Sequence, residues 1–429
     1  MNPLASARAY VSAWHLAKAP PQTLQRVRNA RVCRVVAHAY EHVPYYRRLL
    51  DSAGVQPRHI RGVEDLSLIP PTTRETIQRT QLEDLTADNA PAARRQITSG
   101  SSGRPVTTLW TKQDYRTANA LRLRAMWASG WRPGRRMARI RFDTPERTSR
   151  LKSRLRALLA RWGLRQAVFS AWLPAEAHPA ALAAMQPWYI HSYASYLATL
   201  ARAALDAGVR LRPKLVTASG DALTVAARKI IVEAFACEVV DIYSCLELGD
   251  VAFTCRQEQR LHTHSDAHWV EALTPGGLSA APEEEGELTC TSLCHLAMPR
   301  IRYQPGDLVV LATQPCPCGS AHPTIAAIAG RDEDMIRLPD GRLMSPMTFT
   351  DLFADYPRTQ GYRLVQVSNR KLLLQVAPGD DLTADGLEGL RVQVVMLTRN
   401  ALEVEVQVVS EVPALPSGKR RFVVPRRES

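Results

Sequence analysis

The sequence contains no apolar run long enough to span a bilayer, and its opening stretch, MNPLASARAYVSAWHLAKAPP, lacks the uninterrupted apolar core of a signal peptide. We therefore expect a cytoplasmic protein. The eight cysteines are too few and too scattered over 429 residues to form a disulfide scaffold. In a reducing compartment, clustered cysteines are better interpreted as metal ligands.

Acidic side chains are in the minority, with 41 Asp and Glu against 55 Lys and Arg, which gives a formal charge of +14. Such a charge favours an anionic partner: nucleic acid, an anionic membrane or anionic small molecules. No recognised nucleic-acid motif accompanies it. The densest basic stretch, residues 147–165, is expected to be a solvated helix whose apolar stripe packs on the core. We therefore expect neither a nucleic-acid nor a membrane partner.

The segment ITSGSSGRP at residues 97–105 lacks the Gly-Lys-Ser/Thr ending of a Walker phosphate loop. Two short extended runs flank it between Arg95 and Trp110, so we expect it to connect strand to strand and not strand to helix. Its glycines and small hydroxyl residues let backbone N–H groups approach an anion, and Arg104 adds a positive charge. The segment therefore predicts a phosphate-binding loop, with a flexible surface turn as the alternative.

The remaining patterns predict an α/β protein of two or three domains. The first ninety residues are expected to be helical, with one helical stretch closing on Gly54. KLVTASGDAL, AARKIIVEAFA and CEVVDIYSC follow as strand, helix and strand, which indicates a mixed or parallel sheet. Ligands bind such sheets at the carboxyl ends of the strands, where SGD and YSCLE fall. From about residue 331 shorter strands and small helices indicate a separate α+β domain.

Four stretches occur in order: TSGSSGRP at 98–105, YSCLE at 243–247, RYQPGD at 302–307 with GRDED at 330–334, and PSGK at 416–419. Together they resemble the adenylate-forming enzymes, specifically the phenylacetate–CoA ligase-like branch. The resemblance covers nearly the whole chain. It implies a large N-terminal α/β adenylation domain of several subdomains, residues 1–330, followed by a small mobile α+β C-terminal domain, residues 331–429.

The resemblance implies ATP-dependent activation of a carboxylic acid to an acyl-adenylate, with release of pyrophosphate. Charge builds on the phosphates in such a reaction, so the protein must supply donors and cations there. The implied catalytic residues are Lys419, Glu247, which would hold Mg²⁺, and Arg104. The implied nucleotide-binding residues are Ser99, Gly100, Ser101, Ser102 and Gly103 at the phosphates, Gly220, Asp221, Tyr243 and Ser244 near the adenine, Asp307 at the ribose, and Arg331. Glu333 falls at the family's hinge position.

Three positions depart from the pattern of the resembling family. Ser244 stands where a glycine is usual, Leu246 replaces a hydroxyl residue, and Gln304 replaces an arginine. The loss of a phosphate-facing hydroxyl keeps open a second hypothesis, in which the protein binds nucleotide without turning it over.

Three cysteines and a histidine form a candidate metal site: Cys255 and His262 in CRQEQRLH, and Cys316 and Cys318 in CPCGS. Three thiols and an imidazole can close a tetrahedral Zn²⁺ site, and a site closed by four protein ligands is structural. Members of the resembling branch carry the same order of residues. His264 is the alternative fourth ligand.

Aromatic residues between the phosphate loop and Asp221 predict an apolar pocket for an aryl acid, with Trp172, His191 and Tyr193 as its candidate substrate-binding residues. Core packing is the alternative role for these side chains. The resemblance implies transfer of the acyl group to coenzyme A as a thioester. Transfer to an amine or a hydroxyl acceptor is the alternative. A homodimer is the family expectation.

The first prediction concerns Lys419, the implied adenylation lysine. Replacement by alanine removes the cation between the substrate carboxylate and the α-phosphate. Lys419→Ala should therefore lower carboxylate-dependent pyrophosphate exchange by orders of magnitude, while the variant still transfers the acyl group from a preformed acyl-adenylate. Unchanged exchange would remove Lys419 from the mechanism.

Overall fold

The computed structural model describes residues 3–97, 106–141, 166–171, 173–331, 336–340, 343–344, 349, 359–379, 382–412 and 423–424. The chain forms two compact units, each built from two segments of the sequence. Unit 1 comprises Met1–Gly130 and Asp241–Ile328, and unit 2 comprises Trp131–Val240 and Ala329–Ser429. Among the helices of the described residues, none combines the length and the apolar character needed to cross a membrane.

Unit 1 begins with helices, as the sequence predicts. They are α1 (Pro3–Ala17), α2 (Pro21–His42), α3 (Pro44–Ser52) and α4 (Arg74–Arg79), with the 3₁₀ turns η1 (Pro57–His59) and η2 (Val63–Leu68) between α3 and α4. The helical stretch that ends near Gly54 is interrupted at Val43, which adopts an extended conformation with φ −118° and ψ 107°. The cause is Pro44, because a proline disfavours the helical conformation of the residue before it.

The strands of unit 1 form a mixed sheet. In pairing order they are β1 (Thr72–Thr73), β13 (Tyr303–Gln304), β12 (Glu285–Ser292), β14 (Asp307–Leu311), β15 (Thr324–Arg331), β10 (Leu261–Thr263), β9 (Gly249–Thr254) and β8 (Val239–Cys245), and β11 (His268–Leu273) also pairs with β12. The pairing of β1 with β13 is parallel, whereas β8 with β9 and β12 with β14 are antiparallel. The sheet thus brings early and late segments of the sequence together.

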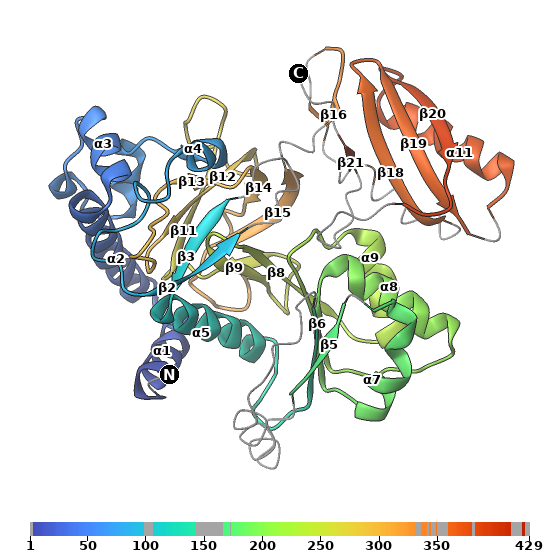
Figure 1. The fold of residues 1–429 in the computed structure, drawn as a ribbon, viewed down its shortest axis with the longest axis horizontal. Helices are drawn as coiled ribbons and strands as arrows, with labels where there is room; N and C mark the ends of the chain where they lie inside the picture. Colours follow the sequence, from blue (N-terminus) through green and yellow to red (C-terminus); the bar gives the residue numbers. More distant parts are fainter. Residues whose placement is uncertain are drawn as a thin grey trace. The chain divides into compact units, whose positions relative to one another are not determined.

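A separate hairpin precedes helix α5 (Lys112–Ala128) in unit 1. Strands β2 (Ala93–Ile97) and β3 (Thr107–Thr111) pair antiparallel, with Ile97 opposite Thr107 (Figure 1). The prediction that the serine- and glycine-rich segment connects two strands is therefore confirmed, although residues 98–105 themselves lie outside the described part. Thr111 then caps α5, because its hydroxyl accepts from the backbone N–H of Asp114.

In the first segment of unit 2, the described residues form four parallel strands and three α-helices, as the alternation of strand and helix predicts. The strands are β5 (Gln166–Ser170), β4 (Met137–Arg141), β6 (Tyr189–Ser192) and β7 (Leu215–Ser219), in pairing order, and the helices are α7 (Pro179–Met185), α8 (Ala194–Asp206) and α9 (Val225–Phe235). A short 3₁₀ turn, η3 (Ala175–Ala177), precedes α7. All five residues of β7 are buried, as is typical of a parallel strand covered on both faces.

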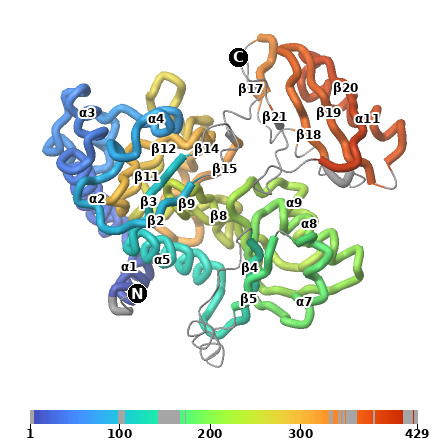
Figure 2. The backbone as a smooth tube through the Cα atoms, in the orientation of Figure 1, coloured from blue at the N-terminus to red at the C-terminus, as the bar shows by residue number. Residues whose placement is uncertain are grey.

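The C-terminal segment of unit 2 forms a small four-stranded sheet. Its strands pair in the order β20 (Glu403–Val408), β19 (Lys371–Pro378), β18 (Thr359–Ser368) and β21 (Val423–Val424), and helix α11 (Ala384–Leu397) accompanies them (Figure 2). Strands β16 (Ile336–Arg337) and β17 (Leu343–Met344) form a further pair. Leu390 and Val394 of α11 pack with Leu372 and Leu374 in one buried cluster. The mixed α/β class, with a large mixed sheet and a small C-terminal sheet, is therefore as predicted.

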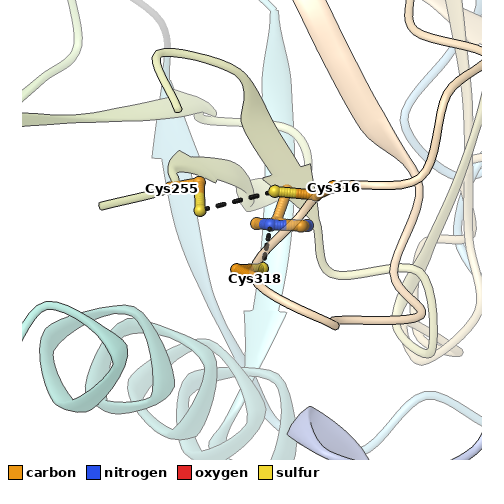
Figure 3. Close-up of side chains that lie close together, drawn as sticks. Cys255, Cys316 and Cys318 are labelled. Atoms are coloured by element: carbon orange, nitrogen blue, oxygen red, sulfur yellow. Dashed lines mark hydrogen bonds between the residues drawn. The ribbon is translucent and has the colours of Figure 1, made fainter. Parts of the chain in front are cut away.

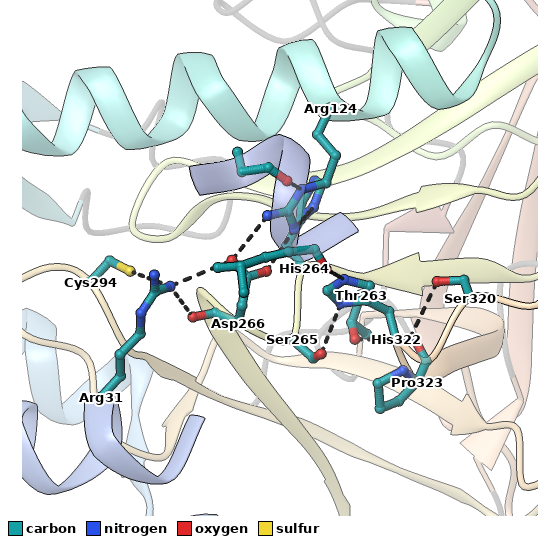
Figure 4. A network of polar contacts seen from close by, with 12 residues as sticks. Arg31, Arg124, Thr263, His264, Ser265, Asp266, Cys294, Ser320, His322 and Pro323 are labelled. Carbon is teal, nitrogen blue, oxygen red and sulfur yellow. Dashed lines mark hydrogen bonds and ion pairs between the residues drawn. The ribbon is translucent and has the colours of Figure 1, made fainter. Parts of the chain in front are cut away.

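A buried ion pair joins the N-terminal helices of unit 1 to the turn before β11 (Figure 4). Arg124 of α5 donates to both carboxylate oxygens of Asp266, at 2.6 and 3.0 Å, and both side chains are only 3% exposed. The Nε of Arg124 also donates to the backbone oxygen of Ala13 in α1, and Arg31 of α2 donates to the backbone oxygen of Asp266. Burial alone would raise the pKa of Asp266, but the charge of Arg124 lowers it well below the ordinary value.

The second prediction tests this ion pair. Asp266→Asn leaves the buried guanidinium of Arg124 without its counter-charge, so we expect the free energy of unfolding to fall by about 3–5 kcal/mol. Chemical denaturation at neutral pH measures the loss. Asp84→Asn is the control, because Asp84 pairs with Arg48 at the surface and its removal should cost less than about 1 kcal/mol. Equal losses in the two variants would contradict a central role for Asp266.

Candidate functional site

Glu247 lies in the tight turn between β8 and β9 and is only 2% exposed. The hydroxyl of Tyr303 in β13 donates to its Oε1 at 3.0 Å, and Nη1 of Arg74 lies 3.7 Å from the same oxygen. Burial and, to a smaller extent, the charge of Glu247 raise the pKa of Tyr303 well above its ordinary value, so the phenol keeps its proton. The carboxylate is thus held at a strand end, where the sequence predicts it, by one neutral donor and one cation.

Trp110 fixes the β2–β3 hairpin against this turn. Its indole Nε1 donates to the backbone oxygen of Leu246 at 3.1 Å. Its ring also covers Gly249, which has φ +81° and where an added Cβ would lie 2.9 Å from the ring. No other residue fits that contact without a shift of the ring. Strand β3, which follows residues 98–105, is therefore attached to the turn that carries Glu247.

Tyr243 and Asp307, to which the resemblance assigns roles at the adenine and the ribose, are in contact within unit 1. The hydroxyl of Tyr243 in β8 donates to Oδ2 of Asp307, the first residue of β14, at 2.5 Å. Ser244 lies next to Tyr243 at an irregularity in the pairing of β8 with β9. Gln304 is buried and donates to Thr289 at 3.2 Å, so this departure from the family pattern is accommodated inside the sheet.

In unit 2, Asp221 caps helix α8. Its carboxylate accepts hydrogen bonds from the backbone N–H groups of Ala194, at 2.6 Å, and Ser195, at 3.2 Å. The sequence SGD is typical of the start of a helix, which would make Asp221 the cap of the helix that follows it. Asp221 instead caps α8, which precedes it in the chain, and Thr224 caps α9. The neighbouring Gly220 has φ +86°, and an added Cβ there would lie 3.1 Å from the ring of Tyr193. Gly220, Asp221 and Tyr193 therefore form one local arrangement.

His191 in β6 is 8% exposed, and its Nδ1 lies 2.8 Å from the hydroxyl of Thr217 in β7. The hydroxyl of Tyr189 lies 2.7 Å from the same Thr217 oxygen. His191 thus belongs to a buried polar row along two parallel strands.

Several residues with implied roles lie outside the part of the chain that the structure describes. Arg331 is the last residue of β15, and its backbone alone is described. The residues outside are Ser99, Gly100, Ser101, Ser102, Gly103, Arg104, Trp172, Glu333 and Lys419.

The four predicted metal ligands converge in unit 1. One ligand atom from each of Cys255, His262, Cys316 and Cys318 lies within 4.8 Å of the other three (Figure 3). The sulfur atoms of Cys255 and Cys316 are 3.6 Å apart, and Nε2 of His262 is 3.2 Å from the sulfur of Cys318. Zinc–sulfur bonds of about 2.3 Å in a tetrahedron separate two sulfur atoms by roughly 3.8 Å, so the spacing fits.

Local hydrogen bonds and burial hold His262 and Cys255 in forms that can bind a cation. Nδ1 of His262 lies 3.1 Å from the backbone oxygen of His322, an arrangement that leaves Nε2 as the ligand nitrogen. Burial lowers the pKa of His262, which favours the neutral imidazole that a metal requires. Burial would raise the pKa of Cys255, but hydrogen bonds from the backbone of Gln257 and Glu258 lower it. His264, the alternative ligand, instead has its Nδ1 3.3 Å from Arg124.

Sequence reasoning missed Tyr303 and Arg74, both of which contact Glu247. Tyr303 lies inside the recognised RYQPGD stretch, where the sequence assigns a role to Asp307 alone. Arg74 follows β1, which pairs with β13 so that Thr72 lies opposite Tyr303. The available signal was the short extended run before Arg74, but its partner strand lies more than two hundred residues away.

The chain is similar in sequence to phenylacetate–coenzyme A ligases. The chain is 31% identical to a phenylacetate–coenzyme A ligase from Thermus thermophilus, over 74% of this chain and 72% of that protein. It is 28% identical to the phenylacetate–coenzyme A ligase of Escherichia coli, over 73% and 72% of the two chains. No family model matches the sequence.

Solved structures show the same fold. A crystal structure of 2-hydroxyisobutyryl-CoA ligase, in a postadenylation state with an acyl-AMP, superposes with a TM-score of 0.79 at 22% identity. The match covers 96% of this chain and 92% of that one. The 31% identity over 74% of the chain shows that the protein belongs to the phenylacetate–CoA ligase-like branch of the adenylate-forming superfamily, a group of AMP-forming acid–CoA ligases.

Proposed function

We propose that this protein activates a carboxylic acid with ATP to an acyl-adenylate, releases pyrophosphate, and transfers the acyl group to coenzyme A as a thioester. The observation that carries this proposal is the 31% identity to a phenylacetate–coenzyme A ligase, because the aligned region covers most of both chains. The arrangement around Glu247, Tyr243 and Asp307 supports it.

In this proposal Asp307 accepts hydrogen bonds from the two ribose hydroxyls, a task suited to a carboxylate with two oxygens. The ring of Tyr243 covers the adenine, and its hydroxyl holds Asp307 in position. Glu247 supplies an oxygen ligand for Mg²⁺, a hard cation that neutralises phosphate charge when it is bound. Gly220 and Asp221 border the adenine, and the capping bonds of Asp221 keep that loop rigid.

The phosphates are assigned to Ser99, Gly100, Ser101, Ser102, Gly103 and Arg104, with Arg331 and Lys419 as further cations. The attachment of β3 to the Glu247 turn through Trp110 supports this assignment, because β3 is the strand that directly follows the loop. We further propose that residues 331–429 act as the mobile domain and residues 1–330 as the adenylation domain. Movement of the small domain would then bring Lys419 to the reacting carboxylate for the first half-reaction.

We propose an aromatic acid as the substrate, recognised by Trp172, His191 and Tyr193. The structure describes two of these residues, His191 and Tyr193, and the contacts of each support the assignment. Tyr193 packs on the Gly220 backbone, so its ring is fixed beside the proposed adenine loop. His191 is oriented by Thr217, and an imidazole that is already oriented can recognise a polar substituent without loss of rotamer freedom.

The third prediction tests the acceptor. The purified protein, given ATP, Mg²⁺ and a panel of aryl and alkyl acids, should form an acyl thioester that requires coenzyme A, with an aryl acid as the best substrate. Mass spectrometry of the product and pyrophosphate release measure the two half-reactions separately. Pyrophosphate exchange without a thioester would favour an amine or hydroxyl acceptor, and no exchange with any acid would favour a nucleotide-binding member without turnover.

We also propose that Cys255, His262, Cys316 and Cys318 bind a structural Zn²⁺. A site closed by four protein ligands has no open position for a substrate, so the metal would stabilise the loops that carry the ligands and take no part in the reaction. The cluster joins Cys255, just after β9, and His262 of β10 to Cys316 and Cys318, which lie between β14 and β15.

The fourth prediction follows from this site. The purified protein should contain about one zinc ion per chain by elemental analysis. Cys316→Ser should lose the metal and unfold at a lower temperature, because one of four ligands is missing. Cys237→Ser, which changes a partly buried thiol outside the cluster, should keep both properties. A wild-type protein that is stable without metal would overturn the zinc assignment.

A further inference from the structure

We propose that Tyr303 is a positioning residue, which holds Glu247 so that one carboxylate oxygen stays free for the metal–nucleotide complex; this inference rests on the function proposed above. The Tyr303 hydroxyl donates to Oε1 of Glu247 at 3.0 Å. Tyr303 is 0% exposed and Glu247 is 2% exposed, so water cannot replace this hydrogen bond.

The direction of the hydrogen bond is fixed by chemistry. A carboxylate oxygen can only accept a hydrogen bond, so the Tyr303 hydroxyl is the donor to Oε1. With its proton directed at Oε1, the hydroxyl contributes to the orientation of Glu247.

The position of the Tyr303 ring is fixed by its surroundings. The residue lies in β13, between β1 and β12, with Thr72 opposite on one side and Cys290 on the other. The guanidinium of Arg300, which is itself fully buried, lies 5.7 Å from the ring centre. A side chain held by a sheet and a stacked cation positions a partner more accurately than a residue on a free loop.

The two oxygens of Glu247 have different environments. Tyr303 and Arg74 both contact Oε1, at 3.0 and 3.7 Å. In the part of the chain that the structure describes, these contacts leave Oε2 for a further ligand. A carboxylate offers about four lone-pair sites, so one oxygen can be anchored while the other coordinates a cation. Tyr303 thus restricts the rotation of the carboxylate without occupying the coordinating oxygen.

Tyr303 is a better subject for a test than Arg74. Replacement of Arg74 would also change the electrostatic field at any bound phosphate, so a loss of nucleotide binding could have two causes. Tyr303→Phe keeps the ring and its contact with Arg300, and it removes only a neutral hydroxyl.

The fifth prediction uses Mn²⁺ as a spectroscopic substitute for Mg²⁺, so that the acid substrate need not be known. Electron paramagnetic resonance titration in the presence of a non-hydrolysable ATP analogue measures the Mn²⁺ affinity of the whole protein. We expect Tyr303→Phe to weaken this affinity by about tenfold, because a hydrogen bond to a buried carboxylate is lost. In the Glu247→Gln background the same change should have no further effect, because the carboxylate it acts through is absent.

Tyr46→Phe is the matched control. Tyr46 is also 0% exposed, and its hydroxyl bonds to the loop that precedes β13, where it donates to Pro299 and accepts from Ile301. This variant should lose thermal stability and keep the Mn²⁺ affinity of the wild type.

The outcomes separate this inference from the proposed function. Equal Mn²⁺ affinities for Tyr303→Phe and Tyr46→Phe would overturn the positioning role while the nucleotide site stands. An additive effect of Tyr303→Phe in the Glu247→Gln background would also overturn it, since it would indicate a general effect on folding. A wild-type protein that binds no Mn²⁺ with the nucleotide would instead overturn the proposed function itself.

Discussion

The packing of unit 1 depends on the buried ion pair between Arg124 and Asp266. Neither side chain can reach water, so each charge must be compensated inside the protein. The compensation comes from distant parts of the chain: Arg124 belongs to α5, Arg31 to α2, and Asp266 to the turn before β11. Arg124 also donates to the backbone of Ala13 in α1. The ion pair and its neighbouring hydrogen bonds therefore connect α1, α2, α5 and the turn before β11 to one another.

The same network reaches the cysteine cluster. His322 follows Cys318 by four residues, and its backbone oxygen orients the candidate ligand His262. Its side chain lies 2.9 Å from Ser265 and 3.0 Å from the backbone oxygen of Leu16 at the end of α1. The loop that carries two of the candidate metal ligands is thus also the loop that holds the N-terminal helix. A metal bound there would restrain α1 as well as its own ligands.

Local features of this protein were predictable from the sequence, and contacts between distant strands were not. The strand–loop–strand arrangement at 98–105 and strand β8 before Glu247 follow from short patterns with a local meaning. The grouping of Cys255 with Cys316, which lie far apart in the sequence, was predicted from metal-ligand chemistry together with the family resemblance. The contact of Tyr303 with Glu247 does not follow from a short pattern, because it depends on the pairing of β13 with β12 and β1. A motif gives the conformation of a few residues, whereas the neighbours of a side chain across a sheet depend on strand order and register. The helix break at Val43 could have been predicted, because Pro44 disfavours a helical conformation of the residue before it.

The two buried carboxylates of Asp266 and Glu247 in unit 1 differ in how completely neighbouring donors and cations compensate their charge. Both oxygens of Asp266 accept hydrogen bonds from Arg124, and Arg31 adds a second cation. Among the described residues, Glu247 accepts one hydrogen bond and has one more distant cation beside it, and both contacts are to Oε1. A buried charge that is incompletely compensated lowers stability, and proteins retain such groups where a ligand completes the compensation. The saturation of Asp266 therefore fits a structural role, whereas Oε2 of Glu247, which has no hydrogen-bond contact among the described residues, is the atom at which we propose that a ligand binds.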